Sequence, residues 1–112
     1  MHGDHLLSTH YDRTVRKWNF SGDCLLVMKG HTDYVWCLVI FDAFLFSGST
    51  DCTVRKWTLD GKPQQIYQGH TNTAVCLTVW NDALFSASWD GSIIQWTGES
   101  PFLLKRIGEI DV

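Results

Sequence analysis

The sequence predicts an all-β fold built from three successive antiparallel units of four strands, on two observations. Its 112 residues are 45% hydrophobic and include six Trp and six Phe but only two Pro, a composition typical of strands that bury large side chains. A Ser, an Asp four residues later and a Trp six residues after that recur three times, with the tryptophans at 18, 57 and 96. The constant interval of 39 residues indicates an internal repeat.

Each unit shows the same order of elements, most clearly the second. Gly30-His31 opens it, and the apolar run that follows predicts the first strand. A tight connection at 41–42 leads to a second strand, and a turn at Asp51 leads to a third strand that ends in Trp57. A glycine-containing turn then precedes a more polar fourth strand. No helical period interrupts this order, so only strands are expected.

Four short strands in 39 residues match the size of one blade of a β-propeller. Residues 1–29 have room only for strands two to four, so the first blade is expected to lack its innermost strand. Residues 30–68 and 69–107 are expected to be complete blades, and 108–112 the start of a further repeat. Since known propellers have about 4–8 blades, we expect three blades to stay open or to be completed by oligomerisation or by further chain.

The repeated positions resemble those of the WD-repeat β-propeller family: Gly-His opens the second and third units, Ser and Asp flank the second turn, and Trp ends the third strand. The Trp-Asp pair that names the family reads Trp-Asn, Trp-Thr and Trp-Thr here. The resemblance implies a hydrogen-bonded chain within each blade, from the indole to Ser, from Ser to His and from His to Asp. The residues at these positions are His31, Ser47, Asp51 and Trp57, then His70, Ser86, Asp90 and Trp96, with Ser8, Asp12 and Trp18 in the first blade.

The Ser, His and Asp of each set can also be read as the triad of a hydrolase. Two features count against catalysis: the set recurs, whereas an enzyme needs one nucleophile, and the Trp would occupy the Ser that should attack. The sequence also has no G-x-S-x-G elbow. We therefore expect a protein that is not an enzyme and has no catalytic residue.

Charge and cysteine spacing limit the classes of partner. The net charge of −3 offers no basic surface to nucleic acid. Cys24, Cys37, Cys52 and Cys76 form no C-x-x-C pair, which argues against a zinc ribbon or a dense disulfide framework. Cys37 and Cys76 lie 39 residues apart in apolar runs, so we expect them to be small buried thiols in a reducing compartment, cytoplasmic or nuclear. The longest apolar run is too short to cross a bilayer. We expect no cofactor, no metal, no nucleic acid and no membrane partner.

Propellers of the WD-repeat family are rigid platforms for protein partners, so the resemblance implies a protein-interaction platform within a scaffold or adaptor. Two alternatives stay open: a regulatory propeller segment of an enzyme such as a kinase or ubiquitin ligase, and a β-trefoil sugar-binding domain, which also has three four-stranded units. Open blade edges predict self-association as well. The family's partner-contacting positions correspond here to Tyr11, Tyr34, Trp36, Thr50, Thr73, Val75 and Trp89.

Overall fold

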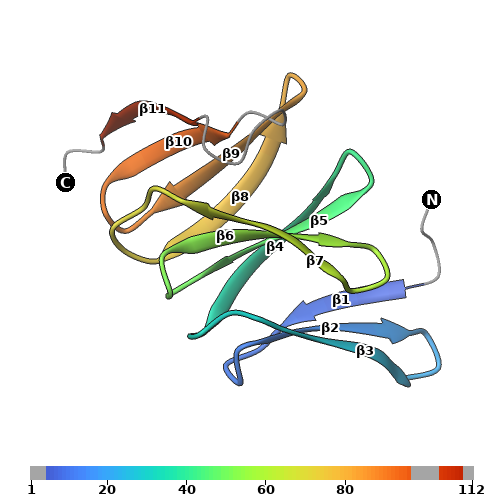
Figure 1. Cartoon of the computed structure of the whole chain (residues 1–112). Coiled ribbons are helices and arrows are strands. Elements are labelled where there is room, and N and C mark those ends of the chain that lie inside the picture. The colour runs from blue at the N-terminus through green and yellow to red at the C-terminus, as the bar shows by residue number, and fades with distance from the viewer. Residues whose placement is uncertain (1–4, 97–103, 110–112) are drawn as a thin grey trace.

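The computed structural model describes residues 5–96 and 104–109, which form eleven β-strands and no helix (Figure 1). The strands make three antiparallel sheets of three, four and four strands, which do not close into a ring. The expected all-β class with open, blade-like sheets is therefore confirmed. The strands are β1 (His5–Thr9), β2 (Thr14–Asn19), β3 (Cys24–Lys29), β4 (Val35–Phe41), β5 (Phe44–Ser49), β6 (Thr53–Thr58), β7 (Pro63–Gln68), β8 (Ala74–Trp80), β9 (Ala83–Ser88), β10 (Ser92–Trp96) and β11 (Leu104–Glu109).

Each sheet is a meander in which consecutive strands pair. The orders are β1-β2-β3, β4-β5-β6-β7 and β11-β10-β9-β8, so β4 and β8 begin the two complete sheets. The first sheet has no counterpart of β4 or β8 among the described residues, as expected for the shortened first blade. Over the same part of the chain, no helix is long and apolar enough to cross a membrane.

Two tight hairpins turn the first strand of each complete sheet into the second. Phe41 pairs with Phe44, which leaves only Asp42 and Ala43 in the loop. Both loop residues have positive φ, 54° and 64°, as a two-residue turn of type I′ requires. Asn81 and Asp82 repeat this geometry at φ 54° and 60° in the next sheet. The short polar side chains of Asn and Asp tolerate this left-handed conformation.

The turn between the second and third strands also repeats in all three sheets. Arg13, Cys52 and Gly91 occupy the same position of the repeat and have φ values of 76°, 73° and 85°. Each of these residues donates its backbone N–H to a carbonyl three residues earlier. The Asp that precedes each of them is thereby held at the same end of every sheet.

The sheets pack face to face and bury two separate cores. The core between the first and second sheets contains Val15, Met28, Val35, Leu45 and Trp57. The core between the second and third sheets is larger and includes Phe46, Tyr67, Ile94 and Trp96, together with Val54, Ala74, Leu77 and Leu84. Alternate residues of each strand enter a core, as the burial of Ser92, Ile94 and Trp96 in β10 shows.

A glycine allows the second and third sheets to approach closely. A Cβ atom at Gly48 in β5 would lie 2.7 Å from Cys37 Sγ and 2.9 Å from the carbonyl oxygen of Ala74. Both distances are below normal contact, so only glycine fits here without a shift of backbone. This contact places β8 directly beside β4 and β5.

The third unit is longer than the repeat predicts. Trp57 pairs with Pro63 in the second sheet, whereas Trp96 pairs with Leu104 in the third, so the return to the outermost strand takes two residues more. Gly108 and Glu109 consequently lie within β11, paired with Ile93 and Ser92. The expected boundary between 107 and 108 thus falls inside a strand, and residues 110–112 lie outside the described part.

Candidate functional site

The predicted set of the second unit is joined by hydrogen bonds from end to end. Trp57 Nε1 donates to Ser47 Oγ at 2.8 Å, and Ser47 Oγ lies 2.6 Å from His31 Nε2. His31 Nδ1 lies 2.8 Å from Asp51 Oδ2. Because a carboxylate only accepts, His31 Nδ1 donates to Asp51, and its other ring nitrogen accepts from the Ser47 hydroxyl. The chain of bonds thus links the loop before β4 to the turn between β5 and β6.

Asp51 is the acceptor on which this arrangement converges. Besides His31, it accepts from Thr32 N at 3.0 Å, Thr53 N at 2.9 Å and the Thr53 hydroxyl. Burial acts to raise the pKa of Asp51, but the hydrogen bonds from His31 and Thr53 outweigh it and hold the pKa well below its usual value. Asp51 is therefore a stable anion that fixes the position of His31.

The third unit repeats the geometry closely. Trp96 Nε1 donates to Ser86 Oγ at 2.7 Å, Ser86 Oγ lies 2.6 Å from His70 Nε2, and His70 Nδ1 lies 3.0 Å from Asp90 Oδ2. Burial would raise the pKa of Asp90 as well, but hydrogen bonds from Ser92, Thr71 N and the His70 ring lower it overall. Two of the three predicted sets are thus brought together in full.

The first unit departs from this pattern. Trp18 Nε1 donates to Ser8 Oγ at 2.8 Å, but the ring nitrogen on Ser8 belongs to His10, whose Nε2 is 2.7 Å away. Asp12 pairs with Arg16 at 2.5 Å instead of with a histidine. His10 is the residue that the repeat alignment does not reveal in this role. A signal existed, because a residue two positions after Ser8 points to the same side of an extended chain.

The hydroxyl groups of Ser47 and Ser86 are already used in hydrogen bonds within their own units. Ser47 accepts from an indole, donates to an imidazole and is fully buried. A nucleophile must instead reach its substrate with a base free to take the proton. The arrangement can hold two loops and a strand together, and in this conformation it presents no attacking oxygen.

Four of the seven predicted partner-contacting residues form one exposed surface, here named the aromatic cluster: Tyr11, Tyr34, Trp36 and Trp89. Ring centroids are 4.8 Å apart for Tyr11 and Tyr34, 5.8 Å for Tyr11 and Trp36, and 5.6 Å for Trp36 and Trp89. The exposed fractions are 66%, 44%, 37% and 61% in chain order. One residue comes from the first unit, two from the second and one from the third, so the cluster bridges all three.

The other three predicted residues are placed differently. The Thr50 hydroxyl accepts a hydrogen bond of 2.6 Å from Trp36 Nε1 and so helps to fix the orientation of the Trp36 ring. Val75 is half-buried in β8. Thr73 is only 1% exposed and does not fit the expectation of a contact residue. Its short side chain lies against Asn72 and its carbonyl accepts from Trp89 N, so it belongs to the loop interior.

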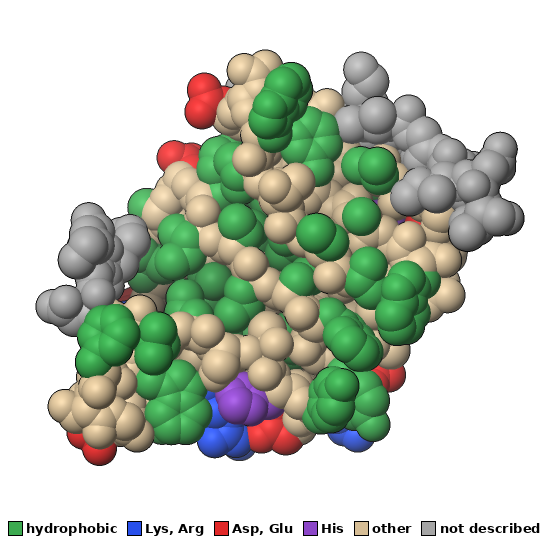
Figure 2. Space-filling view, turned by 180° about the vertical axis from the view of Figure 1, so that it is seen from behind, with side chains coloured by type: hydrophobic (Ala, Val, Ile, Leu, Met, Phe, Trp, Pro, Cys, Tyr) green, Lys and Arg blue, Asp and Glu red, His purple; other side chains and the backbone are tan. Residues whose placement is uncertain are grey.

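Apolar side chains are also exposed away from the aromatic cluster. Phe20 and Trp80 are as exposed as Tyr11, and neither was among the predicted contact residues. The space-filling view shows hydrophobic side chains over much of the face opposite that of Figure 1, with charged side chains mainly at its rim (Figure 2). Phe20 and Trp80 are not among the repeated motif positions, so the repeat does not predict that they are exposed.

The sequence is similar to those of known WD-repeat proteins. The family model described as "WD domain, G-beta repeat" matches residues 22–58 and 61–97, which together make up well over half of the chain. An uncharacterized WD repeat-containing protein of Schizosaccharomyces pombe is 45% identical over 49 residues, covering 41% of this chain and 13% of that protein. Mitochondrial division protein 1 of the same organism is 44% identical over 45 residues, covering 39% of this chain and 7% of that protein.

The matched part is therefore a small fraction of each of these relatives. Each matched repeat contains the outermost strand of one sheet and three strands of the next, since 22–58 holds β3 to β6 and 61–97 holds β7 to β10. The motif spacing, the meander sheets and the family model agree on one assignment: this chain belongs to the WD40 repeat family.

Proposed function

We propose that the chain is a protein-interaction platform, part of a scaffold or adaptor, whose partner docks on the aromatic cluster. WD40 repeats generally mediate protein–protein interactions. The observation that carries the proposal is the contact of four exposed aromatic rings drawn from three units. Exposed Tyr and Trp side chains are the usual anchors of interface hot spots. Each of these residues stays more than a third exposed in the described part of the chain, whereas residues of the two cores are at most 8% exposed.

The hydrogen-bonded chains support the same proposal by holding the cluster in place. Thr50 precedes Asp51, and Trp89 precedes Asp90. Each of these Asp residues ties its turn to the loop that begins the same sheet. A surface held rigid before binding loses less conformational entropy when the partner arrives. The function proposed for the Ser-His-Asp-Trp sets is thus to position the contact residues.

The two alternative functions that the sequence left open are not equally compatible with the family assignment. Membership of the WD40 family removes the β-trefoil sugar-binding reading, which required a different fold. A regulatory segment of a kinase or ubiquitin ligase stays compatible with a binding platform, but no contact in the structure favours it. We also propose an intracellular location, which the four unpaired thiols support. The expected burial is wrong for Cys76, whose side chain is exposed on β8, and Cys37 is only half-buried.

The test replaces two cluster residues singly. Trp36→Ala and Trp89→Ala should each weaken partner binding by about 2 kcal/mol, roughly thirtyfold. Trp80→Ala is the control, because Trp80 is 69% exposed, close to the 61% of Trp89. Trp80 is the last residue of β8, whereas Trp89 bonds to Thr73, just before the first residue of that strand. Partners captured by the wild type and by Trp80→Ala but not by the other two variants would be purified and titrated directly.

Circular dichroism and urea melts of the same variants separate binding from folding. Unchanged melts with lost binding support the platform. If binding falls only in variants that also lose structure, or falls equally in Trp80→Ala, the aromatic cluster is not the docking surface.

We further propose that β1 supports self-association. Among the described strands it pairs only with β2, so at residues 6–9 its other edge is hydrogen-bonded to no described strand and can receive another chain. Light scattering should therefore show a mass that rises with concentration. Leu6→Lys, which puts a charge on this strand, should reduce the rise more than Ile66→Lys on β7. A strict monomer at every concentration contradicts this proposal.

A further inference from the structure

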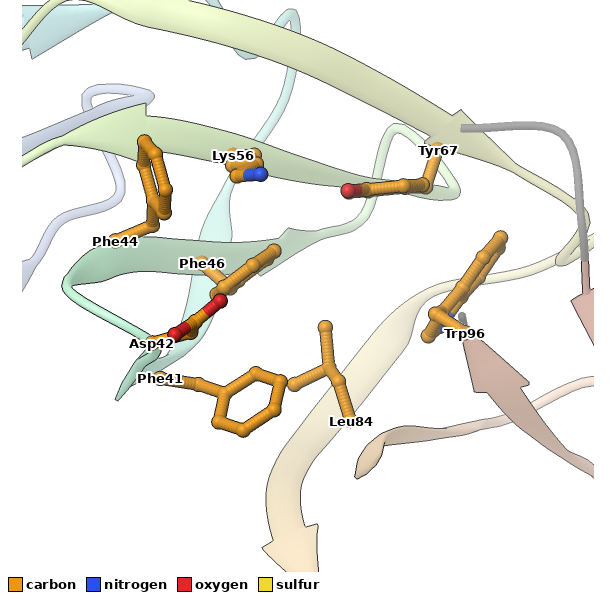
Figure 3. Close-up of a pocket in the computed structure, with 8 residues that line it drawn as sticks. All are labelled: Phe41, Asp42, Phe44, Phe46, Lys56, Tyr67, Leu84 and Trp96. Atoms are coloured by element: carbon orange, nitrogen blue, oxygen red, sulfur yellow. The ribbon is translucent and has the colours of Figure 1, made fainter. Parts of the chain in front are cut away.

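A small hollow opens on the seam between the second and third sheets, far from the aromatic cluster (Figure 3). Its volume is about 30 Å³, room for roughly one or two water-sized groups. It lies by Phe41, at the end of β4, whereas Trp36 is near the start of that strand, roughly 16 Å away at ~3.3 Å per residue. The residues that line it are Phe41, Asp42, Phe44, Phe46, Lys56, Tyr67, Leu84 and Trp96.

Aromatic rings form most of the wall. Phe46 lies 6.3 Å from Phe41 and 6.2 Å from Tyr67, and Tyr67 lies 5.3 Å from Trp96, all between ring centroids. The Lys56 Nζ atom sits 4.0 Å from the centre of the Phe44 ring, a cation–π distance. In Figure 3 the Lys56 ammonium and the Tyr67 hydroxyl face the same space. The hollow thus combines apolar walls with one cation.

The internal repeat shows that this cation is unusual. Lys17 is the residue at the same position one unit earlier, and its Nζ donates to the carbonyl oxygen of Leu59 at 3.1 Å. Lys56 Nζ has no hydrogen bond or ion pair among the described residues, which do not include Gly98, the repeat counterpart of Leu59; it lies 4.0 Å and 6.0 Å from the centres of the Phe44 and Phe46 rings. Among the described residues, the first ammonium joins two sheets, whereas the second lies over these rings without an anionic partner.

We propose that the hollow binds the carboxylate of an aspartate or glutamate side chain on a partner protein, with Lys56 as the cation that pairs with it. A half-buried ammonium gains from a carboxylate partner because surrounding rings replace part of its water. The cavity admits the end of such a side chain, and the aromatic wall contacts its methylene groups. This site is separate from the aromatic cluster, so each can fail without the other.

Asp42 offers a second way to test the charge preference of this site, because it also lines the hollow. Its carboxylate stands on the hairpin at the rim, where it repels an incoming anion. Asn81 occupies the corresponding position of the next hairpin with the same φ of 54°. Asp42→Asn should therefore keep the turn while removing the repulsion.

The test is an NMR titration of the 112-residue chain with defined peptides, following the lysine ε-methylene signals. The probe is the blocked pentapeptide acetyl-Ala-Leu-Glu-Leu-Ala-amide, which carries a single charge. It should shift the Lys56 signal saturably, and the same peptide with Gln in place of Glu should bind about tenfold or more weakly. Lys56→Met should weaken the Glu peptide by a similar factor and Lys56→Arg should restore it. Lys17→Met should have no effect, and Asp42→Asn should tighten binding by about threefold.

Several outcomes would overturn the proposal. Equal binding of the Glu and Gln peptides would show that the hollow recognises apolar surface alone. Full binding to a correctly folded Lys56→Met chain would place the site elsewhere. Tighter binding of acetyl-Ala-Leu-Gln-Leu-Ala with a free carboxyl end would assign the hollow to chain termini, and tighter binding of a central-Lys peptide would make Asp42 the recognising group. If Lys56→Met fails to fold, Asp42→Asn alone decides the sign of the charge preference.

Discussion

The first unit and the second share the hydrogen bond from Trp to Ser but use the motif Asp for different partners. In the second unit Asp51 holds His31, and its side chain is 5% exposed, whereas in the first unit Asp12 holds Arg16 and is 48% exposed. Trp57 is fully buried, while its counterpart Trp18 is only half-buried. The comparison teaches that the motif needs its histidine, which comes from the loop between neighbouring sheets. In the first unit no described histidine bonds to Asp12, and Ser8, Asp12 and Trp18 are only partly buried or exposed.

The largest effect should separate the two tryptophans. Trp57→Ala removes a buried indole from the core between the first two sheets and leaves the buried Ser47 Oγ without its indole donor. We expect it to lower the free energy of unfolding by about 3–5 kcal/mol. Trp18→Ala should cost clearly less, because part of that indole is already in water. Urea melts of the two variants measure both, and equal midpoints would mean that burial in the second unit adds nothing.

The second largest difference is expected between Asp51 and Asp12 in their contribution to the free energy of unfolding. Asp51→Ala leaves the buried His31 ring nitrogen and two backbone N–H groups without their acceptor, so a loss of about 2–3 kcal/mol is expected. Asp12→Ala breaks an exposed pair that solvent screens, so it should cost clearly less than Asp51→Ala. Chemical denaturation at pH 7 gives both values. A larger loss for Asp12→Ala would reverse the comparison.

The pH dependence of stability should also distinguish the first unit from the second. The folded pKa of Asp51 and of Asp90 lies below the unfolded value. These groups therefore stabilise the fold fully above about pH 5, and this contribution is lost as the pH falls through about 3.9 toward the folded pKa. The free energy of unfolding should thus drop between pH 5 and 3. Asp51→Asn should flatten that drop more than Asp12→Asn; identical slopes in the two variants would contradict the assignment.

The smallest effect is expected at Arg16. It pairs with Asp12 four residues earlier on an exposed edge. Solvent screens such pairs, so Arg16→Ala should change the free energy of unfolding by no more than about 0.5 kcal/mol. The same melts provide the measurement, with Asp51→Ala beside it as the large-effect standard. A loss above 1 kcal/mol would show that the first unit relies on this pair as the others rely on histidine.

Much of the fold followed from the sequence because the repeat is periodic. Trp18, Trp57 and Trp96 share an interval that sets the strand order and the turns at Arg13, Cys52 and Gly91. The spacing of the eight residues in the second and third sets also placed them where hydrogen bonds now join them. Periodicity works here because each unit makes nearly the same contacts with its neighbour, so a position in one unit predicts its counterpart in the next.

Tertiary structure decided what differs between units. Thr73 and Tyr34 share a repeat position, yet one is buried and the other exposed, because side-chain size and neighbours set exposure. His10 takes a place on Ser8 that the 39-residue repeat did not indicate, because only the i, i+2 spacing within the first unit points to it. Lys17 and Lys56 share the sequence Thr-Val-Arg-Lys-Trp, but among the described residues only Lys17 donates to a carbonyl oxygen. The sequence by itself determined the repeat, the strands and the paired motif residues through local pattern; three-dimensional packing alone decided which copies of a residue are covered, bonded or left open to a partner.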